Sequence, residues 1–230
     1  MHIPNHMIAH RGVFDNKKVP ENSLLAFQKA FDKKYSIELD VQLTKDNVLV
    51  VFHDEDLKRM TGISKKICDV DYSELQNYHL LDTKESIPTF SEVLKLIKGK
   101  VLIDIEVKNT KRIQETCKVL MDLLKDYPYP YLLKSFNPKI VRVLKDMSNV
   151  EVGYLIHSKY RSRLLKILLQ SKFVIRYSKA DFLAINRKLL ETRKFKKLSS
   201  NYPIMVWTIN NKEDIPEEPF IAVCNNIMKL

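Results

Sequence analysis

Apolar positions along the chain follow two alternating periods. Nine short runs are apolar continuously or at every second position, which predicts β-strands, and six longer stretches are apolar at every third or fourth position, which predicts α-helices. The predicted strands cover residues 7–10, 36–43, 48–53, 101–108, 131–136, 150–156, 181–186, 204–209 and 220–224. The predicted helices cover residues 24–34, 90–97, 113–125, 139–145, 161–169 and 189–198.

This alternation of strand and helix is typical of an α/β fold in which helices cover parallel strands. The pattern favours either an open sheet or a (β/α)8 TIM barrel, and 230 residues are enough for a compact barrel. A barrel of this kind has places for eight strands. We therefore expect one of the nine predicted strands to be misassigned.

The connection between the second and third predicted strands is unusually short. Only twelve residues separate Asp40 from His53, with a turn-like Lys-Asp-Asn sequence at residues 45–47. A packed crossover helix does not fit in this length, whereas two extended arms that run down and back up do. Asp40 and His53 would then lie at the same end of the sheet. We interpret the polar, loop-rich residues 54–88 as a small insertion after the third strand, within a single domain spanning residues 1–230.

Acidic residues occupy one face of two predicted strands. Residues 36–43 place Glu38 and Asp40 opposite an apolar face, and residues 101–108 do the same with Asp104, Glu106 and Lys108. In an antiparallel surface sheet such a polar face would lie in water. In a parallel barrel it points inward, where charged groups need an opposite charge or a metal ion.

Glu38, Asp40 and Glu106 together form a candidate metal site. Carboxylate oxygens are the preferred ligands of hard divalent cations, so the set predicts Mg2+ or Ca2+. A zinc site at His6 and His10 is disfavoured, because their spacing suits a helix and this segment is predicted to be a strand.

Two histidines end predicted strands and are candidates for proton transfer. His10 closes the first strand and His53 closes the third, and the carboxyl ends of the strands are where barrel active sites form. A single histidine at such a place is more often structural, but two beside an acidic cluster favour catalysis. Arg11 and Lys108 would supply the positive charge that phosphate oxygens require.

Composition limits the partners that are compatible with the chain. The net charge of +11 and a pI near 9.4 favour anionic ligands such as phosphate esters, nucleic acid or an anionic membrane surface. Only four glycines are present, without a glycine-rich phosphate loop, and the three cysteines lie far apart without a C-x-x-C pair. We find neither an apolar stretch long enough to span a bilayer nor a secretory signal, and therefore expect a cytoplasmic protein.

Basic residues concentrate at positions 187–197 among scattered apolar residues. This run predicts a solvated amphipathic helix, with peripheral contact to an anionic membrane as the alternative. A nucleic-acid-binding module is a further alternative for the basic surface. The absence of a nucleic-acid-binding motif and the inward acidic residues argue against it, so no nucleic-acid partner is expected.

Eight motifs, taken in order, resemble those of the glycerophosphodiester phosphodiesterase family. The opening motifs are IAHRG at residues 8–12, PENS at 20–23 and E-x-D at 38–40. They are followed by HDEDLKRMTG at 53–62, IPTFSEVL at 87–94, IEVK at 105–108, SF at 135–136 and VWTIN at 206–210. The resemblance thus covers nearly the whole chain. Only the final segment, FIAVCNN at residues 220–226, departs from the family's usual Gly-Asp-Gly-Ile strand and Thr-Asp dipeptide.

The resemblance implies a (β/α)8 barrel with a small insertion after the second histidine, and metal-dependent hydrolysis of small glycerophosphodiesters to glycerol 3-phosphate and an alcohol. Residue by residue, it implies acid/base catalysis by His10 and His53, phosphate binding by Arg11 and Lys108, a pocket lined by Trp207, and metal binding by Glu38, Asp40, Glu106 and, as a further candidate, Glu21. Water or the substrate's own glycerol hydroxyl would be the nucleophile. Phospholipase D-like or cyclising cleavage of lysophospholipids on the same barrel is the alternative reaction. The motifs specify neither the alcohol head group nor the oligomeric state.

Overall fold

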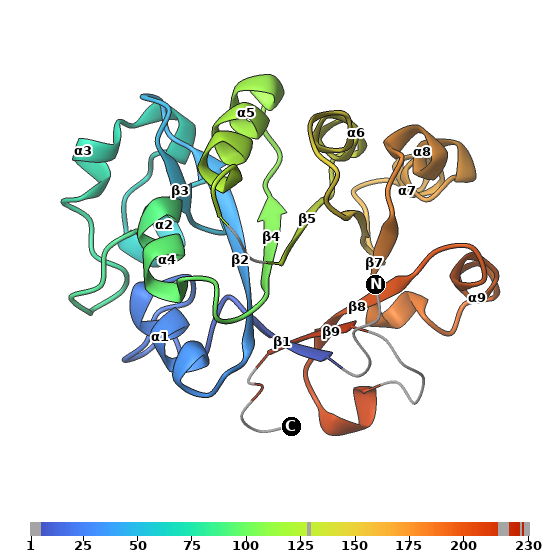
Figure 1. Ribbon diagram of the computed structural model, residues 1–230, viewed down its shortest axis with the longest axis horizontal. Helices are drawn as coiled ribbons and strands as arrows, with labels where there is room; N and C mark the ends of the chain where they lie inside the picture. Colours follow the sequence, from blue (N-terminus) through green and yellow to red (C-terminus); the bar gives the residue numbers. More distant parts are fainter. Residues whose placement is uncertain (1–5, 128–129, 216–220, 226, 228–230) are drawn as a thin grey trace.

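Eight parallel strands close into a barrel in the computed structural model, which describes residues 6–127, 130–215, 221–225 and 227. Each strand pairs with its neighbour along the chain, and the last pairs with the first, as Figure 1 shows. This closure confirms the predicted TIM barrel. The barrel strands are β1 (His6–His10), β2 (Ser36–Leu43), β4 (Ile103–Val107), β5 (Tyr131–Ser135), β6 (Val152–Ile156), β7 (Phe182–Asn186), β8 (Ile204–Ile209) and β9 (Ile221–Cys224).

All nine predicted strands are present, so the expectation that one is misassigned is wrong. The ninth strand, β3 (Leu49–Val51), lies outside the barrel. It returns antiparallel along β2, pairing Leu49 with Leu43 and Val51 with Val41. The chain then continues so that the Phe52 amide donates to the carbonyl oxygen of Asp40 at 2.9 Å. The short connection therefore runs out and back, and both of its arms end at the mouth of the barrel.

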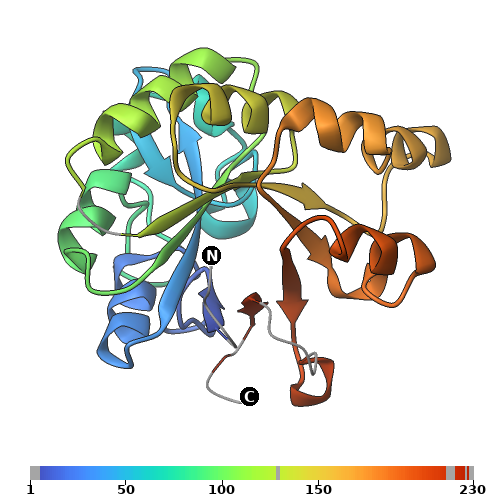
Figure 2. The same cartoon turned by 45° about the vertical axis from the view of Figure 1, so that its right-hand side comes forward.

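Helices cover the outside of the barrel (Figures 1 and 2). Most lie where the apolar period predicts them, but α8 was not predicted, and the predicted helix at 189–198 is broken. There a 3-10 turn at Arg187–Leu189 ends before a shorter helix begins, because Thr192 is extended. The covering helices are α1 (Leu24–Asp32), α4 (Phe90–Ile97), α5 (Ile113–Leu124), α6 (Pro138–Met147), α7 (Arg163–Leu169), α8 (Lys172–Ser178) and α9 (Arg193–Ser199).

Residues after β3 fold into short elements with a core of their own. These are α2 (Lys58–Thr61), a 3-10 turn at Ile67–Asp69 and α3 (Tyr72–Leu75). Their buried side chains pack with Val50 and Phe52 rather than with the main core. The segment thereby forms a cap beside the barrel mouth, at the left of Figure 1.

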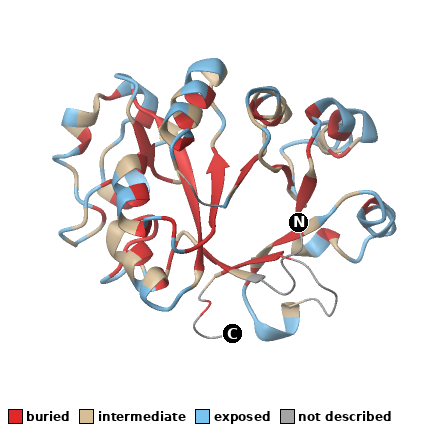
Figure 3. Cartoon of the chain, viewed as in Figure 1, coloured by how far each residue is buried: buried red, intermediate tan, exposed pale blue. Residues whose placement is uncertain are grey.

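The barrel has two apolar layers separated by its strands. Side chains that point outward pack against the helices and form the larger core. Figure 3 shows that the barrel strands are mostly buried. A smaller core fills the floor of the barrel and includes Ile8, Leu132, Phe182 and Met205. Further along the same strands the inward positions become polar, so the barrel is closed by hydrocarbon at one end and charged at the other. The predicted strand residue Phe220 and the motif residue Asn226 lie outside the described residues.

Candidate active site

A tight turn after β1 places the first charged groups at the barrel mouth. Arg11 and Gly12 both have positive φ, at 55° and 82°. A Cβ atom at Gly12 would lie 2.8 Å from the Ala26 backbone, so only glycine fits against α1 at this close approach. The turn points the Arg11 amide at Glu38, to which it donates at 3.1 Å.

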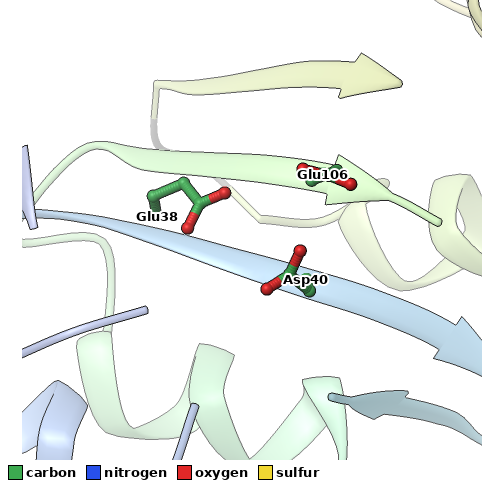
Figure 4. Close-up of side chains that lie close together, drawn as sticks. All are labelled: Glu38, Asp40 and Glu106. Carbon is green, nitrogen blue, oxygen red and sulfur yellow. The ribbon is translucent and has the colours of Figure 1, made fainter. Parts of the chain in front are cut away.

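Three carboxylates converge at the carboxyl ends of two neighbouring strands. Glu38 and Asp40 belong to β2 and Glu106 to β4, and the strand register sets Asp40 beside Glu106. One oxygen from each residue lies within 4.8 Å of the others, and all three residues are buried (Figure 4). Ligand oxygens about 2.0–2.6 Å from a Mg2+ or Ca2+ ion fall within this spread, so the set fits a hard divalent cation.

Arg11 and Lys108 are two of the cations that contact this acidic cluster. The Lys108 ammonium lies 2.7 Å from Glu106 Oε1 and 3.2 Å from Asp40 Oδ1, and Arg11 Nε lies 3.4 Å from Asp40 Oδ2. Burial alone would raise the pKa of Asp40, but the charges of Lys108 and its neighbours outweigh it and hold that pKa well below the usual range. For Glu106 burial prevails over Lys108, so its pKa is raised. The cluster therefore contains one firmly ionised acid and one that resists ionisation.

Glu21 is bound by guanidinium groups beside the cluster. Arg11 and Arg59 each donate to its Oε1 at 2.7 Å, and Asn16 donates to its Oε2 at 2.8 Å. Burial opposes its charge, yet the Arg59 hydrogen bond and the Arg11 charge lower the pKa of Glu21 to about 2. Within the described part of the chain, Glu21 is not among the acids whose oxygens converge. Its geometry is that of an arginine partner.

Both predicted histidines lie at the mouth, and each is oriented through Nδ1. His10 Nδ1 lies 2.5 Å from Asn225 Oδ1, and the Asn225 amide is fixed in turn by donating to Asn210 at 2.9 Å. His53 Nδ1 lies 2.6 Å from Asp54 Oδ1. In each case the partner is an acceptor, so Nδ1 carries a proton and Nε2 is the ring nitrogen left for proton transfer. Burial, the largest effect, lowers the pKa of His10.

His10, His53, Glu38 and Glu106 line one cavity of about 250 Å³. Its far wall is aromatic, since Trp207 meets Phe136 edge-on at 5.3 Å between ring centroids and lies 5.3 Å from the His157 ring. Trp207 is fixed by donating its indole N–H to the Ala184 carbonyl at 3.0 Å. One side of the cavity is thus charged and the other is flat and apolar.

A buried lysine is the largest feature that the sequence analysis missed. Lys134 on β5 is 2% exposed, donates to Asp104 Oδ2 and lies 3.3 Å from Glu38 Oε1. The alternation of Leu132, Lys134 and Phe136 along β5 is the signal that could have placed it inside the barrel.

Three further site residues also escaped sequence reasoning. Asn22 donates to Asp40 Oδ2 at 3.0 Å, Arg59 binds Glu21, and Asn225 orients His10. The first two lie within the recognised PENS and HDEDLKRMTG motifs, where no role was assigned to them. Asn225 lies in the segment that departs from the family pattern, and only the closed barrel brings it to β1.

Comparisons with known proteins agree on one family. The model of the glycerophosphoryl diester phosphodiesterase family matches residues 10–218. A glycerophosphodiester phosphodiesterase from Caldanaerobacter subterraneus subsp. tengcongensis is 33% identical over 228 residues, covering 91% of this chain and 87% of the relative.

Solved structures show the same fold. The glycerophosphodiester phosphodiesterase from Thermotoga maritima superposes with a TM-score of 0.74 at 28% identity, covering 97% of this chain and 96% of that one. A phosphodiesterase from Oleispira antarctica, solved in complex with the product sn-glycerol-3-phosphate, gives a TM-score of 0.81 at 22% identity, covering 97% and 93%. Among the described residues, no helix is both long and apolar enough to cross a membrane.

Proposed function

Because the chain belongs to the glycerophosphoryl diester phosphodiesterase family, whose members are phosphoric diester hydrolases, we propose that it hydrolyses small glycerophosphodiesters to glycerol 3-phosphate and an alcohol. The family match also confirms the resemblance that the motifs indicate. One observation carries the proposal: two oriented histidines line a single cavity at the carboxyl end of the barrel together with Glu38 and Glu106, two of the three converging carboxylates.

A divalent cation is the cofactor that this donor set supports. Glu38, Asp40 and Glu106 would hold Mg2+ or Ca2+ through oxygen atoms, the ligand type that both ions prefer. When bound, the ion supplies Lewis-acid charge that offsets the negative charge on the phosphate. Arg11 and Lys108 border the same acids and would bind the remaining phosphate oxygens.

The histidines divide the proton transfers. His10 has a lowered pKa because it is buried, so near neutral pH it is unprotonated and suited to accept a proton from the nucleophile at Nε2. The complementary role, protonation of the leaving alkoxide, then belongs to His53, whose Nε2 is presented to the same cavity by Asp54. Asn225 and Asp54 act as positioning residues, because each holds its imidazole in one orientation and tautomer.

Substrate shape follows from the two unlike walls of the cavity. The phosphate belongs on the charged side, and the glycerol carbon chain belongs against the flat aromatic side formed by Trp207 and Phe136. The structure of the Oleispira antarctica phosphodiesterase with sn-glycerol-3-phosphate supports a pocket of this fold that accepts such a product.

The test is release of glycerol 3-phosphate from glycerophosphocholine and glycerophosphoethanolamine, with Mg2+, with Ca2+ and with chelator. We expect metal-dependent release that falls by a factor of about 10²–10⁴ in His10→Ala, the range typical of a lost general acid or base. Glu38→Ala should abolish the metal-dependent release of glycerol 3-phosphate. His79→Ala is the matched control, since His79 is exposed and lies outside the cavity.

Product identity separates this reaction from its alternatives. Release of glycerol 3-phosphate supports hydrolysis of a water-soluble diester. A cyclic phosphate product would mean that the substrate's glycerol hydroxyl is the nucleophile. Turnover only of lysophospholipids, with release of the head-group alcohol, would contradict the proposed substrate class and favour the phospholipase D-like reaction.

A further inference from the structure

Helices α7 and α8 expose large apolar side chains that the barrel does not use. No residue of α7 is buried, and Leu164, Ile167 and Leu168 are 80%, 58% and 54% exposed. On α8, Phe173 is 76% exposed and Tyr177, one turn later, is 43% exposed. Their spacing gives each helix one apolar stripe. Exposed apolar clusters of this kind mark interaction surfaces.

This apolar face is surrounded by positive charge. Residues 152–180 contain seven lysines and arginines and no aspartate or glutamate. Within the described part of the chain, Arg161, Arg163, Lys172 and Arg176 form no ion pair, and all four are exposed. Together with the exposed apolar residues of α7 and α8, these four define what we term the α7–α8 face.

Cations of α9 lie next to this face. Helix α9 is the next helix after α7 and α8 around the outside of the barrel (Figure 1), and the charge of Lys166 on α7, after burial, lowers the pKa of Lys194 on α9. The large apolar side chains of α9 itself, Phe195 and Leu198, are buried against the barrel. The basic run at 187–197 therefore extends the charge of the α7–α8 face without adding apolar surface to it.

Residues before and after α7 form hydrogen bonds with His157, which lines the cavity. His157 donates its backbone N–H to the Tyr160 hydroxyl at 3.1 Å. Gln170, at the end of α7, donates to the His157 carbonyl at 3.0 Å. The face thus adjoins the aromatic wall of the mouth, on the side of the barrel away from α2 and α3 (Figure 1). In Figure 3 many residues of these two helices are coloured as exposed.

We propose that the α7–α8 face docks on the surface of an anionic lipid bilayer. Apolar side chains flanked by lysine and arginine are the combination by which interfacial helices bind acidic headgroups and insert into the acyl boundary. A second copy of the chain is a poor occupant, because two faces without acidic residues would repel each other. Docking would bring the cavity mouth close to lipid-derived phosphodiesters, and it does not depend on the proposed hydrolysis.

The test is flotation of the full chain with vesicles of phosphatidylglycerol and phosphatidylcholine, beside vesicles of phosphatidylcholine alone, at physiological ionic strength. We expect binding to the anionic vesicles and little to the zwitterionic ones. Leu164→Ser/Phe173→Ser should reduce the partition coefficient by about tenfold or more, because both side chains would leave the lipid. Arg163→Gln/Lys172→Gln should reduce it by roughly fivefold for each charge removed. The matched control Lys118→Gln/Lys125→Gln, at exposed positions on α5 and at its C-cap, should bind as the unmodified chain does.

Hydrolysis of a water-soluble diester by these variants should be unchanged, since none of the altered residues lines the cavity. This readout separates the docking surface from the active site. Absence of binding to anionic vesicles would overturn the proposal. Equal binding by the Leu164→Ser/Phe173→Ser variant would also overturn it, because the attraction would then be purely electrostatic. A dimer in analytical ultracentrifugation that this variant dissociates would instead identify a second copy as the occupant.

Discussion

Replacing Lys134 with methionine would remove the positive charge from the most deeply buried ionic group of the barrel. The Lys134 ammonium donates to Asp104 and lies 3.3 Å from Glu38, and all three side chains are at most 2% exposed. Methionine fills nearly the same space without charge. The variant therefore leaves two carboxylates facing each other in the barrel with no cation between them.

The expected cost is large because the remaining charges have no access to water. Removing one partner of a buried ion pair typically destabilises a protein by about 3–5 kcal/mol. For a chain of this length a loss of 1 kcal/mol lowers Tm by roughly 2–4 °C, so a decrease on the order of 6–20 °C is expected. Replacing Asp104 as well, in Lys134→Met/Asp104→Leu, should recover about 2 kcal/mol or more, since apolar pairs often substitute for buried ionic ones.

The loss should also depend on pH. Burial raises the pKa of Asp104 to about 7 against the charge of Lys134, and removing Lys134 raises it further. The folded variant then binds a proton at pH values where the unfolded chain does not, so its stability falls as pH rises, by up to about 1.4 kcal/mol per unit. The deficit relative to the unmodified protein should therefore be larger at pH 8 than at pH 6.

Urea unfolding in the presence of chelator measures both effects. The free energy of unfolding is compared for the unmodified protein, Lys134→Met and the double variant at the two pH values. A Lys134→Met variant within about 1 kcal/mol of the unmodified protein would refute the reasoning, given the cost expected for a broken buried pair. A double variant no more stable than Lys134→Met would refute it equally.

Three other substitutions test separate parts of the structure. Gly153→Ala should destabilise by about 1–3 kcal/mol in urea unfolding, because the new methyl would lie 2.2 Å from the Phe182 ring; an unchanged midpoint would contradict this close approach. The pKa of Glu21 is about 2, below its usual value, so Glu21 contributes about 3 kcal/mol to the free energy of unfolding above pH 4.5. This contribution is lost as pH falls toward 2. In Glu21→Gln the free energy of unfolding should accordingly fall less steeply between about pH 4.5 and pH 2. An unchanged pH dependence would exclude Glu21 as the source of the loss. Asn225→Ala should lower kcat for diester hydrolysis by about tenfold or more with little change in KM, since it frees the His10 ring; equal loss in both constants would indicate a binding role instead.

Much of the fold could be predicted because the period of apolar residues within each short segment indicates whether it forms a strand or a helix. Period-two and period-3.6 patterns placed all nine strands, and the apolar outer faces of β2 and β4 pack on helices as expected. Short helices were harder, since α8 has only seven residues and is separated from α7 by a two-residue break. Most apolar residues of α7 are exposed, so the helical period of α7 did not indicate burial against the barrel.

The candidate site was predictable where its residues alternate along one strand. Glu38, Asp40 and Glu106 were placed together from sequence, and the strand register brings them side by side. Contacts between strands far apart in sequence carry no such local signal. Asn225 reaches His10 only because β9 closes the barrel onto β1, a contact that spans nearly the whole chain.

The buried ionic side chains inside the barrel do not neutralise one another completely. In the described part of the chain, five buried carboxylates (Glu21, Glu38, Asp40, Asp104 and Glu106) face the four cations Arg11, Arg59, Lys108 and Lys134, which leaves one negative charge in excess. Burial is the main reason for the raised pKa values of Asp104 and Glu106, and the charges of the neighbouring carboxylates add to it. A divalent cation would reverse the sign of the interior to a single positive charge, which a phosphodiester anion would in turn neutralise. Ion and substrate would thus favour each other's binding, and the apolar floor below them would limit the screening of that attraction by water.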